Sequence, residues 1–267
     1  MIQHDLHGDK GPWLVFVHGL TCDATDWKYQ IEAFKNTHRC LSVDLRGHGR
    51  SAGLPGPYDQ ETLAADVVAL IHELSIDQAV LVGHSMGTRA ITAAALQAPQ
   101  RVAGLVFVDG SKQGAGDPVE ARNGVLALLG DAEKAKPFVN KMFSMMFTDK
   151  SNPDEQKTIT ARAESIPFAI FSHLMSHMAA WDAGRMQVAF EQLSIPVGVI
   201  QSTSVTPERN RLCLKPGETT PYLDLIRQSI KDVVVEVTDN VGHFSQLDAP
   251  DDVNRMIASI AARALEW

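Results

Sequence analysis

A serine between two glycines is the first group in this chain that suggests chemistry. Residues 83–87 read Gly-His-Ser-Met-Gly, the G-x-S-x-G pattern, with Ser85 at its centre. The pattern suits a sharp turn from a strand into a helix, because side chains at Gly83 and Gly87 would collide there. Such a turn exposes the serine at the start of the helix, where free N–H groups favour a developing negative charge. We therefore expect Ser85 to act as a nucleophile.

The oxyanion formed when a serine attacks a carbonyl group needs at least two hydrogen-bond donors. The backbone N–H of Met86, next to the serine, is the first expected donor. Residues 17–20, Val-His-Gly-Leu, close the first apolar run of the chain, and the N–H of Leu20 is the expected second donor. We expect His18 to brace this loop rather than to take part in catalysis.

A serine hydroxyl becomes nucleophilic when a base takes its proton. His243 follows the last apolar run, on a loop that must pass over the strand ends, and it is the expected base. His84 and His48 are expected to be structural. His173 and His177 lie four residues apart without an H-E-x-x-H motif, so we expect His177 to line a pocket rather than to bind a metal.

The elements that must position these residues are visible as six short, valine-rich apolar runs. They have the pattern of strands buried on both faces of a parallel sheet. The runs cover residues 12–20, 39–47, 78–85, 102–111, 195–202 and 232–243. Helical spacing of apolar residues appears between or after them, at 61–74, 86–98 and 251–265. The alternation predicts an α/β fold with a mainly parallel central sheet flanked by helices.

The alternation stops between residues 112 and 191, where no strand pattern occurs. Six of the nine methionines and six of the ten phenylalanines fall in this segment, which favours an apolar, adaptable pocket. We predict a helical cap over residues 112–191, inserted into a core formed by residues 1–111 and 192–267.

Composition narrows the classes of function. The chain has 267 residues, 45% of them hydrophobic, and a formal net charge of −8 without a basic cluster. These values favour a soluble, cytoplasmic protein that binds a small molecule and neither nucleic acid nor a membrane. Its three cysteines lack CxxC spacing, so no disulfide framework, metal or cofactor is expected. A homodimer is left open.

Four motifs in order along the chain resemble those of the α/β-hydrolase superfamily. They are His-Gly-Leu (18–20), Asp-Leu-Arg-Gly-His-Gly-Arg-Ser (44–51), the serine motif, and Val-Gly-His-Phe-Ser-Gln-Leu-Asp-Ala-Pro (241–250). The nearest resemblance is to the cap-bearing branch with bacterial esterases, C–C bond hydrolases and epoxide hydrolases. It covers nearly the whole chain outside the cap and implies an α/β-hydrolase fold with His243 as general base.

The acid that orients the histidine is not where many relatives carry it. The segment after residues 195–202 continues Thr-Ser-Val-Thr-Pro and has no carboxylate before Glu208. Asp109 ends the neighbouring apolar run, 24 residues after Ser85, and some members of the superfamily carry their acid at this place. The resemblance therefore implies Asp109 as the acid, with Glu208 as the alternative.

A serine nucleophile argues against the dehalogenases and epoxide hydrolases of this fold, which use a carboxylate. We expect hydrolysis of a carboxylic ester or related acyl bond of a small, largely apolar substrate. Trp181, Met145 and Phe143 are the expected pocket residues, with packing inside the cap as the alternative. A C–C bond hydrolase, a cofactor-free dioxygenase and a ligand receptor with a slow hydrolase site are the other functions left open.

Overall fold

The structure is a computed structural model that describes residues 1–206 and 208–265. Its strands are β1 (His4–His7), β2 (Trp13–Val17), β3 (Arg39–Val43), β4 (Ala79–His84), β5 (Val102–Val108), β6 (Val197–Gln201), β7 (Thr203–Val205), β8 (Arg211–Cys213) and β9 (Val233–Val237). Its α-helices are α1 (Lys28–Phe34), α2 (Gln60–Glu73), α3 (Gly87–Gln97), α4 (Pro118–Leu129), α5 (Ala132–Ser144), α6 (Pro153–Ser165), α7 (Phe168–Gly184), α8 (Met186–Glu191), α9 (Pro221–Ser229), α10 (Ser245–Asp248) and α11 (Pro250–Ala264), and two short 3₁₀ helices are η1 (Ala24–Trp27) and η2 (Gly49–Ser51).

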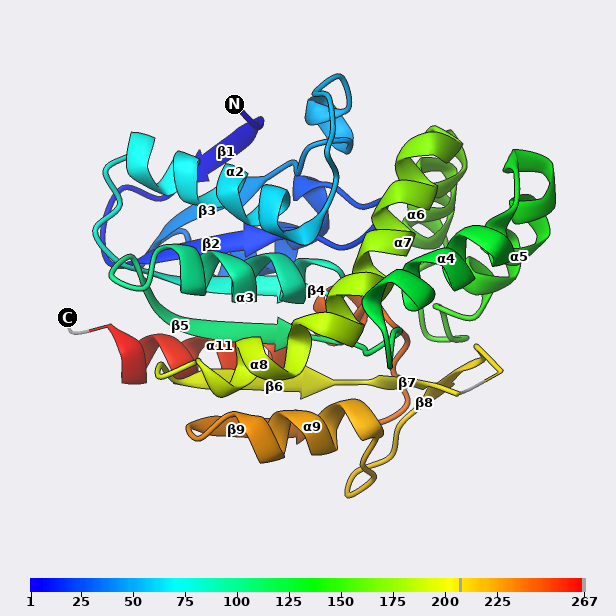
Figure 1. Cartoon of the computed structure of the whole chain (residues 1–267). Coiled ribbons are helices and arrows are strands. Elements are labelled where there is room, and N and C mark those ends of the chain that lie inside the picture. The colour runs from blue at the N-terminus through cyan, green and yellow to red at the C-terminus, as the bar shows by residue number, and fades with distance from the viewer. Residues whose placement is uncertain (207, 266–267) are drawn as a thin grey trace.

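Seven strands form one sheet in the order β1-β3-β2-β4-β5-β6-β9. All neighbouring pairs are parallel except β1 with β3, at one edge. The carboxyl ends of the parallel strands therefore lie along one side of the sheet, on the right in Figure 1. Strands β7 and β8 form a separate antiparallel hairpin directly after β6.

Helices cover both faces of the sheet, and side chains of each strand alternate between them. On β2, Val15 and Val17 join the cluster packed by α2, α3, α8 and α9, whereas Leu14 and Phe16 join the cluster packed by α1 and α11. All four side chains are fully buried. Burial on both faces explains why these strands read as continuous apolar runs.

The segment between β5 and β6 is helical among its described residues and contains α4, α5, α6, α7 and α8. Figure 1 shows α4 to α7 gathered beyond the carboxyl ends of the strands, while α8 returns along the sheet. Helix α6 is attached to the core by ion pairs from Arg162 to Asp23 and Asp26, and Glu155 pairs with Lys28. The insertion therefore lies over the edge at which the strands end.

The predicted fold class is confirmed: the sheet is mainly parallel and flanked by helices. The six predicted strands each begin within two residues of the expected start and end one to six residues before the expected end, because the apolar runs continue into the following loops. Strand β1 and the β7–β8 hairpin were not predicted, because each strand has only three or four residues and pairs through its backbone. The predicted domain boundaries stay a prediction.

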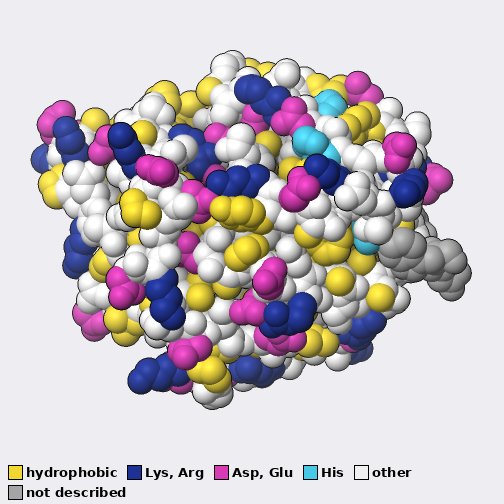
Figure 2. Space-filling view, turned by 180° about the vertical axis from the view of Figure 1, so that it is seen from behind, with side chains coloured by type: hydrophobic (Ala, Val, Ile, Leu, Met, Phe, Trp, Pro, Cys, Tyr) yellow, Lys and Arg dark blue, Asp and Glu magenta, His cyan; other side chains and the backbone are white. Residues whose placement is uncertain are grey.

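The surface agrees with the mixed charge of the sequence. On the face seen in Figure 2, basic and acidic side chains are interspersed rather than gathered into one patch. Among residues 1–206 and 208–265, no helix combines the length and apolarity that crossing a bilayer requires.

Candidate active site

Ser85 occupies the tight turn between β4 and α3. Its φ is +52°, in the left-handed region that non-glycine residues rarely adopt. A Cβ added to Gly83 would lie 2.6 Å from the carbonyl oxygen of Gly87, and one added to Gly87 would lie 2.4 Å from that of Val17. The turn therefore requires glycine at both positions, for the steric reason that the motif suggests.

Three side chains from distant parts of the chain form one hydrogen-bonded line. The Oγ of Ser85 lies 2.9 Å from Nε2 of His243, and Nδ1 of His243 lies 2.5 Å from Oδ2 of Asp109. Because an ionised carboxylate can only accept, the imidazole carries its proton on Nδ1. Its Nε2 is then able to accept the proton of the serine hydroxyl. The structure thus brings together the residues expected as nucleophile, base and acid.

The His243 imidazole is buried, and its pKa falls to about 4. Burial is the largest cause, the positive charge of Arg211 adds to it, and the hydrogen bond with Asp109 opposes both. The ring is therefore neutral at pH 7 and able to act as a base. Its loop is fixed, because the His243 N–H donates to the carbonyl of Met146 at 2.7 Å and the ring of His84 bonds the His243 carbonyl at 2.9 Å.

The segment after β6, which lacks a carboxylate, supports Asp109 instead. The backbone N–H groups of Ser202 and Thr203 both donate to Oδ1 of Asp109 at 2.8 Å, and the Thr203 hydroxyl donates to Oδ2 at 2.5 Å. Burial alone would raise the pKa of Asp109, but the hydrogen bond from His243 and the neighbouring positive charge lower it overall. Glu208, the alternative acid, is exposed on the turn between β7 and β8.

Arg211 on β8 is a member of this cluster that the sequence analysis missed. Its Nη1 donates to the Thr203 hydroxyl at 2.5 Å, lies 3.3 Å from Oδ2 of Asp109 and is 3.0 Å from Nδ1 of His243. Its side chain is only 7% exposed. Both Nη1 and the protonated Nδ1 are donors, so the arginine acts on the imidazole through its charge. No spacing in the sequence marks Arg211, because the hairpin alone brings it to Asp109.

The expected oxyanion donors lie on either side of Ser85. A Cβ added to Gly19 would be 3.1 Å from the Cβ of Ser85, so the loop that carries Leu20 approaches the serine closely. Within the described residues, the backbone N–H groups of Leu20 and Met86 donate to no backbone or side-chain acceptor. Both N–H groups are therefore available to a ligand.

The histidines expected to be structural make structural contacts. His18 accepts the N–H of Leu45 at 3.0 Å through Nε2, and its Nδ1 bonds the carbonyl of Gly19 at 2.7 Å, so it braces the oxyanion loop. His48 packs against His18 with ring centroids 5.0 Å apart. His177, expected to line the pocket, is half-buried and stacks on His173 at 4.2 Å. Among the described residues, no group of three or more His, Cys, Asp or Glu residues could hold a metal.

A buried ion pair joins the serine helix to the helical insertion. Arg89 on α3 binds both oxygens of Asp182 on α7 at 2.7 Å, and both side chains are at most 1% exposed. Arg89 also donates to the carbonyl of Ser111 at 2.7 Å, and the N–H of Gln113 donates to Asp182 at 2.6 Å. The pair therefore fixes the chain where it leaves β5 for the insertion.

A cavity of about 290 Å³ lies between the insertion and the hairpin. Phe138, Met142, Met145 and Met175 line it from the insertion, and Arg211 lines it from the hairpin. Met145, expected in the pocket, is thus in this cavity, next to Met146 whose carbonyl binds the His243 loop.

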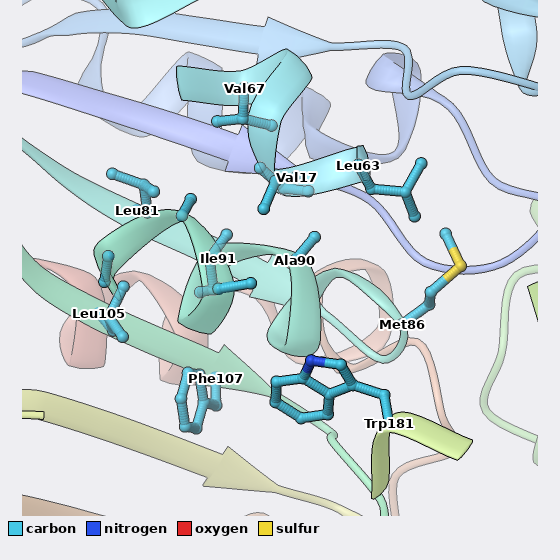
Figure 3. Close-up of a cluster of buried hydrophobic side chains, with 14 of the residues drawn as sticks. Val17, Leu63, Val67, Leu81, Met86, Ala90, Ile91, Leu105, Phe107 and Trp181 are labelled. Carbon is cyan, nitrogen blue, oxygen red and sulfur yellow. The ribbon is translucent and has the colours of Figure 1, made fainter. Parts of the chain in front are cut away.

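Phe143 and Trp181, also expected in the pocket with packing inside the cap as the alternative, both pack in hydrophobic clusters, and their role in a pocket stays a prediction. Phe143 is 3% exposed and packs with Cys22 and Phe244 between the insertion and the core. Trp181 is 6% exposed and belongs to the cluster of Phe107 that Figure 3 shows. Its indole N–H donates to Glu61 on α2 at 3.2 Å. Protein atoms therefore already bury both apolar side chains.

Comparison with protein families gives one match over most of the chain. A model described as the alpha/beta hydrolase family matches residues 14–256. Among curated proteins, 3-oxoadipate enol-lactonase 2 of Acinetobacter baylyi is 24% identical over 253 residues, covering 94% of this chain and 89% of the relative. N-formylmaleamate deformylase of Pseudomonas putida is 36% identical over 116 residues, covering 43% of each protein. The match spans only 28% of an acetyltransferase component of the acetoin cleaving system of Pseudomonas putida, at 39% identity over 104 residues that make up 39% of this chain.

Solved structures share the whole architecture. The enol-lactonase from Burkholderia xenovorans LB400 has a TM-score of 0.75 at 21% identity, covering 98% of this chain and 96% of that one. The esterase from Exiguobacterium antarcticum has a TM-score of 0.78 at 18% identity, covering 97% and 94%. Likeness at this level of identity concerns the fold alone.

Proposed function

Because the chain belongs to the alpha/beta hydrolase family, we propose that it is a serine hydrolase that cleaves a carboxylic ester or a related acyl bond. The observation that carries the proposal is the hydrogen-bonded line from Ser85 through His243 to Asp109, with distances of 2.9 and 2.5 Å. The reaction proceeds through a covalent acyl group on the serine oxygen.

In the first half of the reaction, Nε2 of His243 takes the proton of Ser85 while the serine oxygen attacks the carbonyl carbon. The imidazolium that forms is stabilised by Asp109, which accepts from Nδ1 throughout. The N–H groups of Leu20 and Met86 donate to the oxyanion. The imidazolium then gives its proton to the leaving group, and the acyl group stays on the serine.

In the second half, a water molecule takes the place of the alcohol. His243 accepts the water proton as the oxygen attacks the acyl carbon, and the acid product leaves when the proton returns to Ser85. We further propose that residues 112–191 act as a cap that limits access of water and substrate to the serine. The attachment of α6 and α7 to the core supports a cap with a defined position.

The class of bond is proposed from the relatives together with the site. By their names, the relatives include a lactonase, which opens a cyclic ester, and a deformylase. A serine with a neutral imidazole suits cleavage of an ester and of a formyl group, because each reaction passes through a tetrahedral intermediate with an oxyanion.

The test uses p-nitrophenyl esters of rising acyl chain length and a fluorophosphonate probe that labels activated serines. We expect wild-type protein to hydrolyse short and medium esters and to be labelled on Ser85. Ser85→Ala should lose both properties, while Ser229→Ala, a buried serine on α9, keeps them. Hydrolysis that persists in Ser85→Ala, or oxygen uptake in place of ester cleavage, would contradict the proposal.

A further inference from the structure

The cavity beside the catalytic cluster carries an unusual charge. Among its described lining residues are three cations, Lys112, Arg209 and Arg211, and no aspartate or glutamate. The protein as a whole has a net charge of −8, so a lining in which every charged residue is a cation differs from its average composition. We refer to this cavity as the cationic groove.

Two of the three charges are uncompensated. Arg211 is balanced by Asp109, whose carboxylate lies 3.3 Å from its Nη1. Lys112 and Arg209 form no ion pair or side-chain hydrogen bond with any residue in the ranges 1–206 and 208–265. The groove therefore presents positive charge that an anionic ligand would neutralise.

Lys112 stands on a backbone that is held in place. The residues on either side of it are bound to the buried ion pair of α3 and α7: the carbonyl of Ser111 accepts from Arg89, and the N–H of Gln113 donates to Asp182. Arg209 lies at the turn of the hairpin, where its N–H donates to the carbonyl of Thr206 at 2.8 Å. The two cations thus extend from backbone segments that are held by hydrogen bonds, and their exposed side chains both line the groove.

Most of the other lining residues are apolar, and Arg211 belongs both to the groove and to the catalytic cluster. Phe138, Met142, Met145 and Met175 supply flexible hydrophobic surface. Arg211 joins the groove to His243, whose imidazole separates it from Ser85. A ligand whose reacting carbonyl lies at Ser85 and whose chain extends past His243 into the groove would place that chain against the methionines and its distal end beside the two cations.

We propose that the substrate is an ester or lactone that carries a free carboxylate, bound by Lys112 and Arg209 in the cationic groove. This inference rests on the proposed serine hydrolase function and names its substrate class. The carboxylate is bound away from Ser85, so it takes no part in the chemistry. Bidentate contact with the guanidinium of Arg209 and a point contact with the ammonium of Lys112 suit a carboxylate.

The test compares matched pairs of esters. In the first pair, p-nitrophenyl hydrogen adipate is compared with the ester in which an isopropyl group replaces the free carboxylate. In the second pair, the charge lies on the alcohol: the butyrate of p-hydroxybenzoate is compared with that of p-isopropylphenol. The measured quantity is the ratio of kcat/KM for the anionic ester to that for the neutral ester.

We expect this ratio, for at least one pair, to fall about tenfold or more in the double variant Lys112→Met/Arg209→Met. Lys141→Met is the matched control, because Lys141 is an exposed lysine of α5 outside the groove. It removes the same kind of charge and should leave the ratio unchanged. A ratio that is equal in wild type, double variant and control for both pairs would overturn the inference.

A binding measurement separates this inference from the proposed function. Adipate is titrated calorimetrically into Ser85→Ala protein, and we expect the Kd to rise about tenfold when Lys112→Met/Arg209→Met is added. If Ser85→Ala retained full hydrolysis, the nucleophile would be wrong while this titration still tested the groove. Equal affinity with and without the two cations would refute the groove assignment, whatever the activity.

Discussion

The carboxylate of Asp109 is contacted by five groups besides its own backbone. Two backbone N–H groups, the Thr203 hydroxyl, the His243 imidazole and Arg211 all converge on its two oxygens. Its own φ of +42° is in the left-handed region, so the carboxylate is directed by an uncommon backbone conformation as well. These contacts stabilise the ionised carboxylate and hold it against Nδ1 of His243, so no room is left there for a second carboxylate.

Replacing Asp109 tests its assignment directly. Asp109→Asn should reduce kcat by about 10³- to 10⁴-fold, because an amide does not stabilise the imidazolium and favours the wrong imidazole tautomer. Circular dichroism should show that the fold persists. Glu208→Gln is the matched control and should keep the wild-type rate. The opposite pattern, with Glu208→Gln inactive and Asp109→Asn active, would show that Glu208 and not Asp109 is the acid.

Removing Arg211 should change the pH dependence. With its pKa at about 4, His243 becomes protonated only below about pH 4. The value of kcat/KM for a neutral ester should therefore decrease as the pH is lowered through about 4, which gives the acid limb of the pH profile. Arg211→Met removes a positive charge 3.0 Å from Nδ1, which raises the His243 pKa. The acid limb should therefore move to higher pH by about one unit or more.

The measurement is a pH–rate profile with the neutral ester. Asp109 and the ring of His84, 4.7 Å from that of His243, remain in place in the variant, so the shift reports on the arginine charge. Arg209→Met removes a charge from the same hairpin without contact to the imidazole, and its acid limb should coincide with that of wild type. An acid limb that is unchanged in Arg211→Met would show that this charge does not act on the base.

At the scale of elements, the junction between α3 and α7 depends on one buried ion pair. Asp182→Ala would leave the guanidinium of Arg89 buried without its carboxylate, which costs about 3–5 kcal/mol of unfolding free energy. Urea denaturation should record this loss. Lys134→Ala breaks an exposed ion pair with Asp131 and leaves the Asp131 cap of α5 in place, so it should cost less than about 1 kcal/mol. Equal losses in the two variants would mean that the buried pair is not what holds the insertion.

The elements also show where sequence reasoning succeeds and where it stops. The strand runs and the glycine turn were predictable, because burial and steric collision act on neighbouring residues. Asp109 could be named because it ends a predicted strand at the place where some members of the resembled superfamily carry their acid. Arg211 could not, because a hairpin of two three-residue strands carries it to a carboxylate 102 residues earlier in the chain. Trp181 was ambiguous, because a pocket wall and a hydrophobic core select the same side chain.

At the scale of the whole molecule, several buried histidines make stability sensitive to acid. Burial lowers the pKa of His18, His48 and His84, to about 3 for His48, and that of His243 falls to about 4. Unfolded, each titrates near its ordinary value of about 6.5. Between these values the unfolded chain binds protons that the folded chain does not, so stability is full above about pH 6.5 and falls as the pH is lowered through this window.

The free energy of unfolding should therefore decrease from pH 7 to pH 5, by about 1.4 kcal/mol per pH unit for each fully titrating histidine. Asp26, whose pKa burial raises, opposes the trend at the lower end. Urea titrations at several pH values provide the measurement. His48→Gln should flatten the slope, whereas His72→Gln, at an exposed site on α2, should not. A stability that rises toward pH 5 would contradict neutral buried imidazoles.

The β7–β8 hairpin has a consequence for anyone who would re-engineer this enzyme. One short hairpin carries both the guanidinium of Arg211, which contacts the base, and the guanidinium of Arg209, which lines the groove. Replacing the hairpin with that of another protein to broaden substrate selectivity would also remove Arg211 from the base and so alter proton transfer. Selectivity and proton transfer therefore cannot be changed independently at this hairpin. Libraries that diversify the methionine walls and spare this hairpin would vary preference while keeping the chemistry intact.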